Sequence, residues 1–226
     1  MNLSVHRRTP ETDQRTVAVL VLGMHRSGTS SVAGTLVRLG GTAPVNLIPP
    51  GEDNERGFWE STVLAALNDE ILAAGGSDWM DWRAYDVARI DAASANFLNA
   101  RAKSVLASEF GDIGFPIIKD PRMCRLMRFW APVFEEAKWS VRALLPLRSP
   151  LEVAWSLKRR NDISPGYGCL MWLRHVLDAE VENPRDGPRG PGLANFSCRQ
   201  ARHARAGRQT VGSRLAEPER KRFRGH

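Results

Sequence analysis

The fold of this chain is decided by residues 17–30, which read VAVLVLGMHRSGTS. An apolar run, Val17 to Leu22, leads directly into the turn Gly23 to Ser30, and apolar residues at helical spacing follow. A short apolar run of this kind is typical of a buried strand. A strand, a glycine-bounded turn and a helix start in this order make a nest of backbone N–H groups, reinforced by the helix dipole. The sequence therefore predicts a site for a phosphate or sulfate group in the turn.

This turn resembles the nucleotide-binding P-loop, G-x-x-x-x-G-K-[ST], with one difference. Thr29 stands where the P-loop has the lysine that reaches the β- and γ-phosphates. Ser30 keeps the hydroxyl of the last position, and Arg26 places a cation inside the turn. The missing lysine argues against an ATPase or kinase and against a triphosphate ligand. A glycine-rich turn without any ligand is the alternative.

A second strand-to-helix segment follows at residues 141–160. Its apolar run is predicted to end at Arg148, and Ser149 is predicted to cap a helix that has Pro150 at its first position. Glu152 would close a capping box with Ser149. Arg148 is then expected at the carboxyl edge of the strand, which is where parallel α/β sheets bind ligands.

Arg148 and Ser156 are candidates for a second phosphate site. Ser156 lies a little under two turns into the predicted helix. A guanidinium fork and a hydroxyl that converge there suit a phosphate. The alternative is a surface arginine and an ordinary helix serine.

The two motifs together resemble sulfotransferases that use 3'-phosphoadenosine-5'-phosphosulfate (PAPS). The resemblance implies that the first turn holds the 5'-phosphosulfate, and that an arginine and a serine eight positions apart hold the 3'-phosphate. Segments 56–60, RGFWE, and 117–122, IIKDPR, add to the resemblance, which extends from about residue 17 to residue 180. Arg26 resembles the arginine of bacterial and carbohydrate-directed members. The implied donor-binding residues are Gly23, Arg26, Ser27, Gly28, Thr29, Ser30, Arg148 and Ser156.

Sulfuryl transfer needs a cation at the leaving phosphate and a base for the proton of the acceptor. Arg26 and the N–H groups of the turn are expected to serve the leaving phosphate, and Lys119, at the end of a predicted strand, to assist. The reaction needs no metal, and the scattered histidines and cysteines form no pattern typical of a metal site.

The identity of the base is left open between three side chains. Cytosolic small-molecule members use a histidine two positions after a strand-end lysine, and Pro121 stands there in this chain. Glu60 resembles the glutamate of carbohydrate and protein-tyrosine sulfotransferases, although an acid before a helix also favours the helix dipole without any catalytic role. Asp120 is more simply an N-cap before proline, and His25 a hydrogen-bonded loop residue.

The alternation of elements predicts an α/β fold, a P-loop NTPase-like parallel sheet flanked by helices on both faces. The long Pro- and Gly-rich stretch at 43–57 is expected to be a loop that shapes the acceptor site. Strands are predicted at 17–22, 115–119 and 141–147, and helices at 27–39, 61–74, 91–109, 121–137, 150–160 and 167–181.

Three regions are predicted along the chain. Residues 1–16 are expected to form a disordered arm, residues 17–182 the sulfotransferase-like domain, and residues 183–226 a disordered tail rich in Arg, Gly and Pro. The formal net charge of +7 comes from this tail, which has 11 basic and 3 acidic residues. One interpretation is a basic tail for nucleic acid or acidic lipid. The preferred one is that the reading frame was lost near Glu182, which leaves the fold incomplete and its activity in doubt.

The composition indicates in which compartment the protein works and which classes of partner it binds. No apolar run is long enough to span a bilayer and the N-terminus lacks an apolar signal segment, so we expect a cytoplasmic protein. No specific nucleic-acid partner is expected, because the excess charge is confined to the tail. The expected acceptor is a hydroxyl or amine on a small molecule, glycan, lipid or peptide tyrosine. The rival functions are a P-loop phosphotransferase and a catalytically inactive sulfotransferase remnant.

Overall fold

The computed structural model describes residues 15–51, 54–55, 57–111 and 114–181. This part of the chain forms three strands, six α-helices and one 3-10 helix. The strands are β1 (Thr16–Val21), β2 (Ile117–Lys119) and β3 (Trp139–Leu144). The helices are α1 (Thr29–Arg38), α2 (Thr62–Ala74), η1 (Val87–Arg89), α3 (Ala92–Phe110), α4 (Met123–Glu136), α5 (Pro150–Asn161) and α6 (Pro165–Val181).

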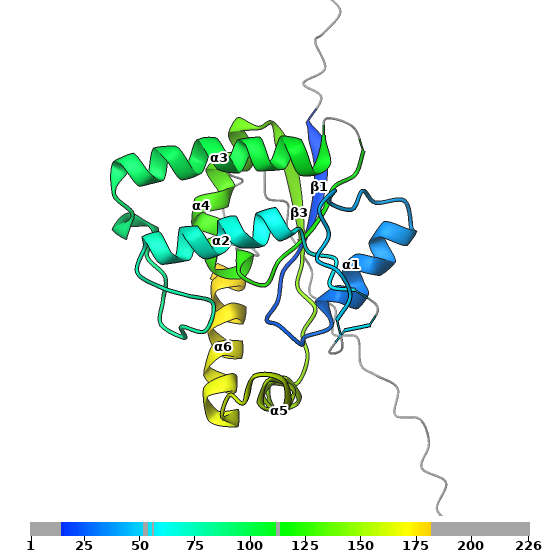
Figure 1. Ribbon diagram of the computed structural model, residues 1–226, viewed down its shortest axis with the longest axis vertical. Helices are drawn as coiled ribbons and strands as arrows, with labels where there is room; N and C mark the ends of the chain where they lie inside the picture. Colours follow the sequence, from blue (N-terminus) through cyan, green and yellow to red (C-terminus); the bar gives the residue numbers. More distant parts are fainter. Residues whose placement is uncertain (1–14, 52–53, 56, 112–113, 182–226) are drawn as a thin grey trace, which may run out of the picture.

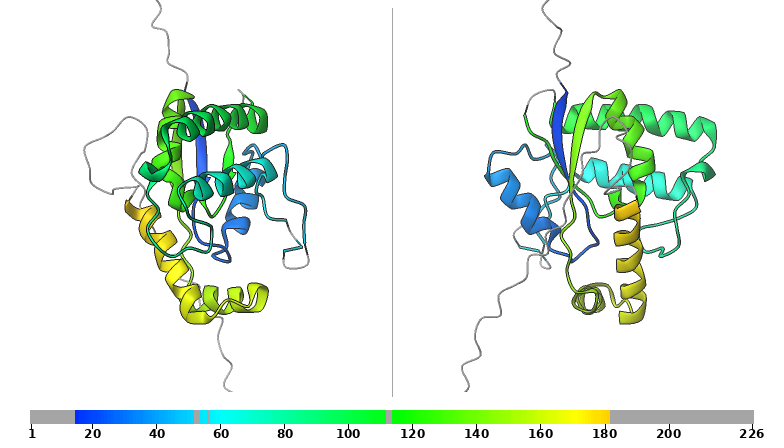
Figure 2. Two further views of the ribbon diagram at one scale, coloured as in Figure 1. Left: turned by 60° about the vertical axis from the view of Figure 1, so that its left-hand side comes forward. Right: turned by 180° about the vertical axis from the view of Figure 1, so that it is seen from behind.

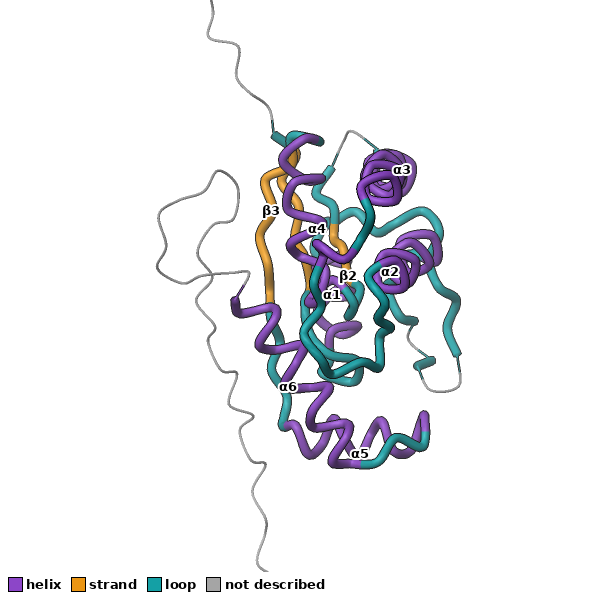
Figure 3. Tube along the Cα trace, turned by 90° about the vertical axis from the view of Figure 1, so that its left-hand side faces the viewer, coloured by secondary structure: helices purple, strands orange, loops and turns teal. Residues whose placement is uncertain are grey.

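The strands form one parallel sheet in the order β2-β1-β3 (Figure 3). In its register Val21 lies beside both Lys119 and Leu144, so the carboxyl ends of the three strands meet at one edge. The turn after β1, the segment after β2 and the segment after β3 therefore start side by side. This is the edge at which the sequence places its two anion motifs.

Helices cover both faces of the sheet, with α1 on one face and α2, α3 and α4 on the other (Figures 1 and 2). The side chains of β1 alternate accordingly. Ala18 and Leu20, with Leu22 just after the strand, belong to the large core under α2 to α4, while Val19 and Val21 belong to the smaller core under α1. The predicted α/β class, with a parallel sheet between helices, is confirmed for the described residues.

Helices α5 and α6 lie beyond the carboxyl edge of the sheet (Figure 1). Val153 and Leu157 of α5 and Met171 of α6 enclose Met24 of the first turn in a separate buried cluster. The first turn thus packs against α5, the helix that follows β3, and against α6. The outer surfaces of these two helices carry exposed apolar side chains, among them Leu151, Trp155, Leu170, Leu173 and Leu177.

The predicted elements agree with the structure except at their ends. The main error is the end of the third strand, which was expected to reach Arg148 but stops at Leu144. Pro146 explains the early stop, because proline has no N–H to donate to a sheet. The predicted tail and residues 1–14 of the predicted arm lie outside the described residues. The arm was expected to include residue 16, but Thr16 is already the first residue of β1. No helix in the described part is long and apolar enough to cross a membrane.

Candidate anion and transfer site

The turn between β1 and α1 is held in a strained path by its neighbours. Arg26 has φ 68° and Gly28 has φ 86°, the left-handed region that side chains other than glycine rarely adopt. The N–H of Ser27 donates to the carbonyl of Met24 at 3.1 Å and closes a tight turn. The N–H of Gly23 donates to Sγ of the buried Cys124 at 2.9 Å. Gly23 was predicted to bind the anion, but its N–H is directed to α4 instead.

The start of α1 leaves polar groups without partners. Its N-cap is Gly28, so no side chain caps the helix. The N–H of Ser31 donates to the Gly28 carbonyl at 3.1 Å, which leaves the N–H groups of Thr29 and Ser30 without an acceptor among the described residues. The hydroxyl of Ser27 is buried and has no hydrogen-bond partner among the described residues. A buried hydroxyl and free amides at the positive end of a helix dipole are what an anion binds.

The second motif reaches the first turn through hydrogen bonds. Nε of Arg26 donates to Oγ of Ser156 at 2.8 Å, and Nη1 of Arg148 donates to the backbone carbonyl of Arg26 at 3.0 Å. Ser156 is buried at the inner side of α5, whereas the Arg148 side chain is nearly half exposed. The structure thus brings together the three side chains that the sequence assigned to two phosphates.

The predicted capping box at the start of α5 is wrong. Ser149 is the N-cap residue but its side chain makes no cap hydrogen bond. Glu152 instead accepts from Nε of Arg148 at 2.8 Å. The charge of Arg148 competes successfully for this carboxylate, because an ionic hydrogen bond is stronger than one to a neutral amide. The first amides of α5 therefore stay uncapped beside the Arg148 guanidinium.

Lys119, at the end of β2, forms a buried ion pair with Glu60. Its Nζ also lies 3.4 Å from Oγ of Ser30, in the first turn of α1. Both side chains are almost completely enclosed, so the pair sits in a medium where charges interact strongly. Lys119, the predicted assistant of the leaving group, and Glu60, the predicted base, are thus in contact with each other. They lie next to the turn at residues 23–30, which is called the anion turn below because an anion is predicted to bind there.

Burial is the main influence on Glu60 and raises the pKa of its carboxyl. Lys119 opposes this effect and Asp120 adds to it. A carboxyl group with a raised pKa accepts protons at higher pH, which suits a general base. Asp120, the second candidate, is occupied: its carboxylate binds the backbone N–H and the guanidinium of Arg122. The predicted N-cap at Asp120 is wrong, because α4 begins at Met123 with Arg122 as its N-cap.

Three further residues, to which the sequence assigned no role, also lie at the site. Nδ2 of Asn54 lies 3.3 Å from Oγ of Ser30 and donates to the carbonyl of Gly57 at 2.7 Å, so the long loop reaches the anion turn. Cys124 receives the Gly23 N–H, and Arg122 anchors Asp120. Only the Pro- and Gly-rich composition of the loop, which predicts proximity to a cleft, pointed toward Asn54.

His25 lies in the turn with its ring edge-on to Trp79, the ring centroids 5.0 Å apart. Its Nε2 is buried and has no hydrogen-bond partner among the described residues. Burial, and then the charges of Arg122 and Arg160, hold the pKa of His25 well below its usual range. The imidazole is therefore neutral, and its low basicity makes it a weaker candidate than Glu60 for the base.

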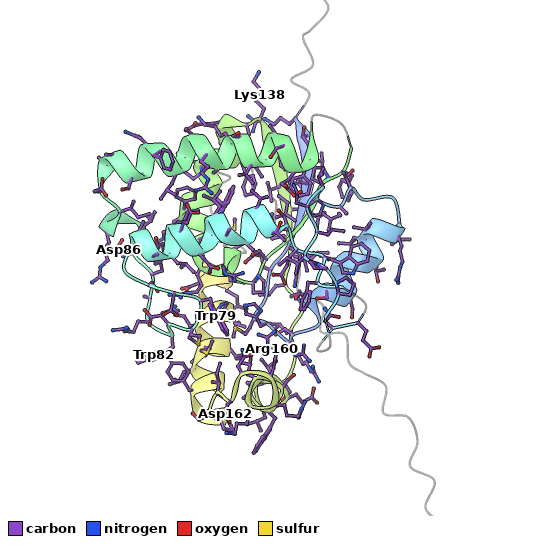
Figure 4. All side chains as sticks on the ribbon, viewed as in Figure 1. Trp79, Trp82, Asp86, Lys138, Arg160 and Asp162 are labelled. Carbon is purple, nitrogen blue, oxygen red and sulfur yellow. The ribbon has the colours of Figure 1, made fainter. Side chains whose placement is uncertain are left out.

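The tryptophans near the turn fall into packing and exposed positions. Trp59 packs against Gly34 of α1 and Trp79 against His25, and both are partly buried. Figure 4 shows Trp79 and Arg160 toward the inner side of α5 and α6, whereas Trp82 and Asp162 lie toward the outside. Trp82 is 44% exposed.

Comparison with models of protein families, with curated proteins and with solved structures returned no match. Within the described ranges, no group of three or more His, Cys, Asp or Glu side chains is placed to hold a metal ion.

Proposed function

We propose that this protein is a sulfotransferase that moves a sulfuryl group from PAPS to an acceptor hydroxyl or amine. The observation that carries the proposal is the hydrogen-bonded set Arg26, Ser156 and Arg148 around the uncapped start of α1. Two guanidinium groups and two hydroxyls, those of Ser27 and Ser156, face one edge of a parallel sheet. Such a set offers more anion-binding groups than a single phosphate needs, and PAPS carries anionic groups at both ends of its adenosine.

The proposed roles follow from these positions. The amides of the α1 start, with Arg26 and the Ser27 hydroxyl, bind the 5'-phosphosulfate, and Arg148 and Ser156 bind the 3'-phosphate. Lys119 stabilises the charge that develops on the leaving phosphate oxygen. Glu60 takes the proton of the acceptor as the acceptor oxygen or nitrogen bonds to sulfur and the bond between sulfur and the bridging oxygen breaks. The product nucleotide is 3'-phosphoadenosine-5'-phosphate.

The proposed function includes a P-loop NTPase-like fold. A central β1, an anion turn and α1 on one face are consistent with a P-loop-like arrangement, and this arrangement is shared with phosphotransferases. Thr29 in place of the lysine favours sulfuryl over phosphoryl transfer, because a phosphotransferase uses that lysine on the β- and γ-phosphates. The acceptor is a small molecule, a glycan or a lipid, and we place the reaction in the cytoplasm.

Isothermal titration calorimetry tests the proposal by comparing 3'-phosphoadenosine-5'-phosphate with ATP plus magnesium. We expect the bisphosphate to bind more tightly, and preference for ATP would favour the phosphotransferase. A bisphosphate that binds, with no turnover of PAPS on any acceptor, would indicate an inactive remnant.

Arg148→Ala sharpens the same test. The variant should weaken the bisphosphate far more than adenosine-5'-phosphosulfate, which lacks the 3'-phosphate. Arg159→Ala, which removes an exposed arginine of α5, the helix that follows Arg148, is the matched control and should affect neither ligand much. An equal loss for both ligands in Arg148→Ala would remove Arg148 from the 3'-phosphate site.

A further inference from the structure

One ammonium group, Lys119 Nζ, lies between two oxygens that have different tasks in the proposed reaction. It pairs with Oε1 of Glu60, the proposed base, and lies 3.4 Å from Oγ of Ser30, in the proposed anion turn. An ammonium group has three donors, so both contacts are possible at once, but its charge is most stabilised by the nearest anion. In the structure that anion is the Glu60 carboxylate.

The pair is enclosed, so the position of Lys119 sets the charge of Glu60. The Lys119 side chain is 3% exposed and that of Glu60 is 6% exposed. The charged groups that face Glu60 are Lys119 on β2, Asp120 after it and Arg122 at the start of α4. Arg122 is itself bound to Asp120 and to Asp69. Lys119 is therefore the main cation that keeps the buried Glu60 ionised.

An anion at Ser30 changes this balance. It offers Lys119 a second negative partner, and a buried carboxylate that loses its cation is costly and binds a proton instead. The anion also disfavours the ionised form of Glu60 through repulsion between like charges. The two effects act in the same direction.

We infer that Lys119 is a positioning residue that couples the anion turn to Glu60: an anion bound at Ser30 draws the ammonium from Glu60, and Glu60 then accepts a proton. When the acceptor is already bound, this proton comes from the acceptor group. In binding alone it comes from solvent. The coupling rests on the proposed function for the identity of the anion. It predicts that the base is held by Lys119 until the donor is present.

The test measures proton uptake on anion binding. Calorimetry in buffers of different ionisation enthalpy gives the protons taken up, with 3'-phosphoadenosine-5'-phosphate and inorganic pyrophosphate as separate probes. Wild-type protein should take up more protons than Glu60→Gln, by a difference that approaches one proton as the raised pKa of Glu60 passes the working pH. The ligand's own protonation cancels in this difference.

Variants of lysine separate the coupling from a general charge effect. Lys119→Met should lose the Glu60-dependent uptake and bind both probes more weakly. Lys103→Met is the matched control, because Lys103 pairs with Glu136 at 2.8 Å on the surface of α3 and α4. It should leave the uptake unchanged.

The outcomes distinguish the coupling from the proposed function. Equal uptake in wild type and Glu60→Gln overturns the coupling, even if the bisphosphate binds. Binding of pyrophosphate but not of the bisphosphate overturns the proposed function, and the uptake with pyrophosphate still decides the coupling. If neither probe binds, both are overturned. If Glu60→Gln does not fold, the infrared spectrum of wild type should show a new protonated-carboxyl band on adding the anion, and its absence overturns the coupling.

Discussion

At the scale of single residues, the site is built from side chains whose partners lie far away in the sequence. Arg26 meets Ser156, Lys119 meets Glu60, and Gly23 meets Cys124. The sequence predicts the side chains that form the first two pairs, because each belongs to a motif. It does not predict the pairs themselves, since they depend on how the segments after three strands fold at one edge.

Trp59 packs so closely on α1 that Gly34 has no room for a side chain. A Cβ at Gly34 would lie 2.7 Å from Nε1 of Trp59. Gly34→Ala is therefore expected to lower the free energy of unfolding by about 1–3 kcal/mol through overpacking, despite the better helix propensity of alanine. Gly166→Ala in α6 is the control, because its Cβ would meet nothing within 4 Å. Urea unfolding that ranks Gly34→Ala as the more stable of the two would contradict this packing.

Because His175 of α6 is buried, we expect the free energy of unfolding to fall in mild acid. Its ring is fully buried, its Nδ1 donates to the Met171 carbonyl at 2.8 Å, and burial lowers its pKa to about 4. The unfolded histidine, with a pKa near 6.5, binds the proton first, so stability falls as the pH drops from about 6.5 to about 4, by roughly 3 kcal/mol for this group. His175→Gln should reduce the slope of unfolding free energy against pH in this window, where the buried His25, whose pKa is also lowered, still contributes. A curve parallel to wild type would show that His175 is not the group responsible.

At the scale of elements, periodicity and turn residues predict the helices and strands well, and their ends less well. Apolar spacing locates α2 and α4, because their buried faces are long and regular. The end of β3 and the cap of α5 were mispredicted for local reasons: Pro146 stops the sheet, and Arg148 takes the carboxylate that the capping box needed. Such competition between a cap and an ion pair is decided by side-chain positions that spacing alone does not define.

Replacing the N-cap serine by alanine is expected to destabilise the protein at α2 but to have little effect at α5. The Ser61 side chain accepts the Leu64 N–H at 3.0 Å, whereas Ser149 caps nothing. Ser61→Ala should cost about 1 kcal/mol of unfolding free energy, within the usual range for a lost N-cap. Ser149→Ala should stay within about 0.5 kcal/mol of wild type, as ordinary surface changes do. Thermal or chemical unfolding of both variants checks the pair, and a larger loss at Ser149 would mean that its hydroxyl does cap α5.

At the scale of the whole molecule, two cores on the faces of the sheet and a third cluster under the first turn hold the site between them. The sequence predicts this layered α/β arrangement from the order of its elements. It does not predict which helix surfaces stay uncovered. Leu170, Leu173 and Leu177 recur at helical spacing along α6, yet all three are at least 40% exposed.

We call Leu170, Leu173 and Leu177 the leucine stripe, and we expect the folded protein to bind an apolar dye there. Exposed apolar side chains that adjoin one another are uncommon on soluble monomers and bind apolar probes. A variant with all three leucines changed to serine should bind less of the dye 1-anilinonaphthalene-8-sulfonate, with an unfolding free energy close to that of wild type. The dye fluorescence of Leu64→Ala, a buried change in α2, serves as the control for dye bound through loosening of the core. Unchanged dye binding by the triple variant would show that the stripe is not accessible.

Because the Gly23 amide donates a hydrogen bond to the buried Cys124, the rate at which Cys124 is labelled reports opening of the anion turn. Cys124 is fully enclosed and burial raises its pKa to about 12, so its sulfur is neither accessible to alkylating reagents nor present as the thiolate that would attack them while the turn is closed. Cys169 is partly exposed and labels without such an event. The ratio of the two labelling rates, followed by mass spectrometry, therefore reports how often α4 and the turn separate. A ligand that bridges the turn and α5 should slow the Cys124 rate alone.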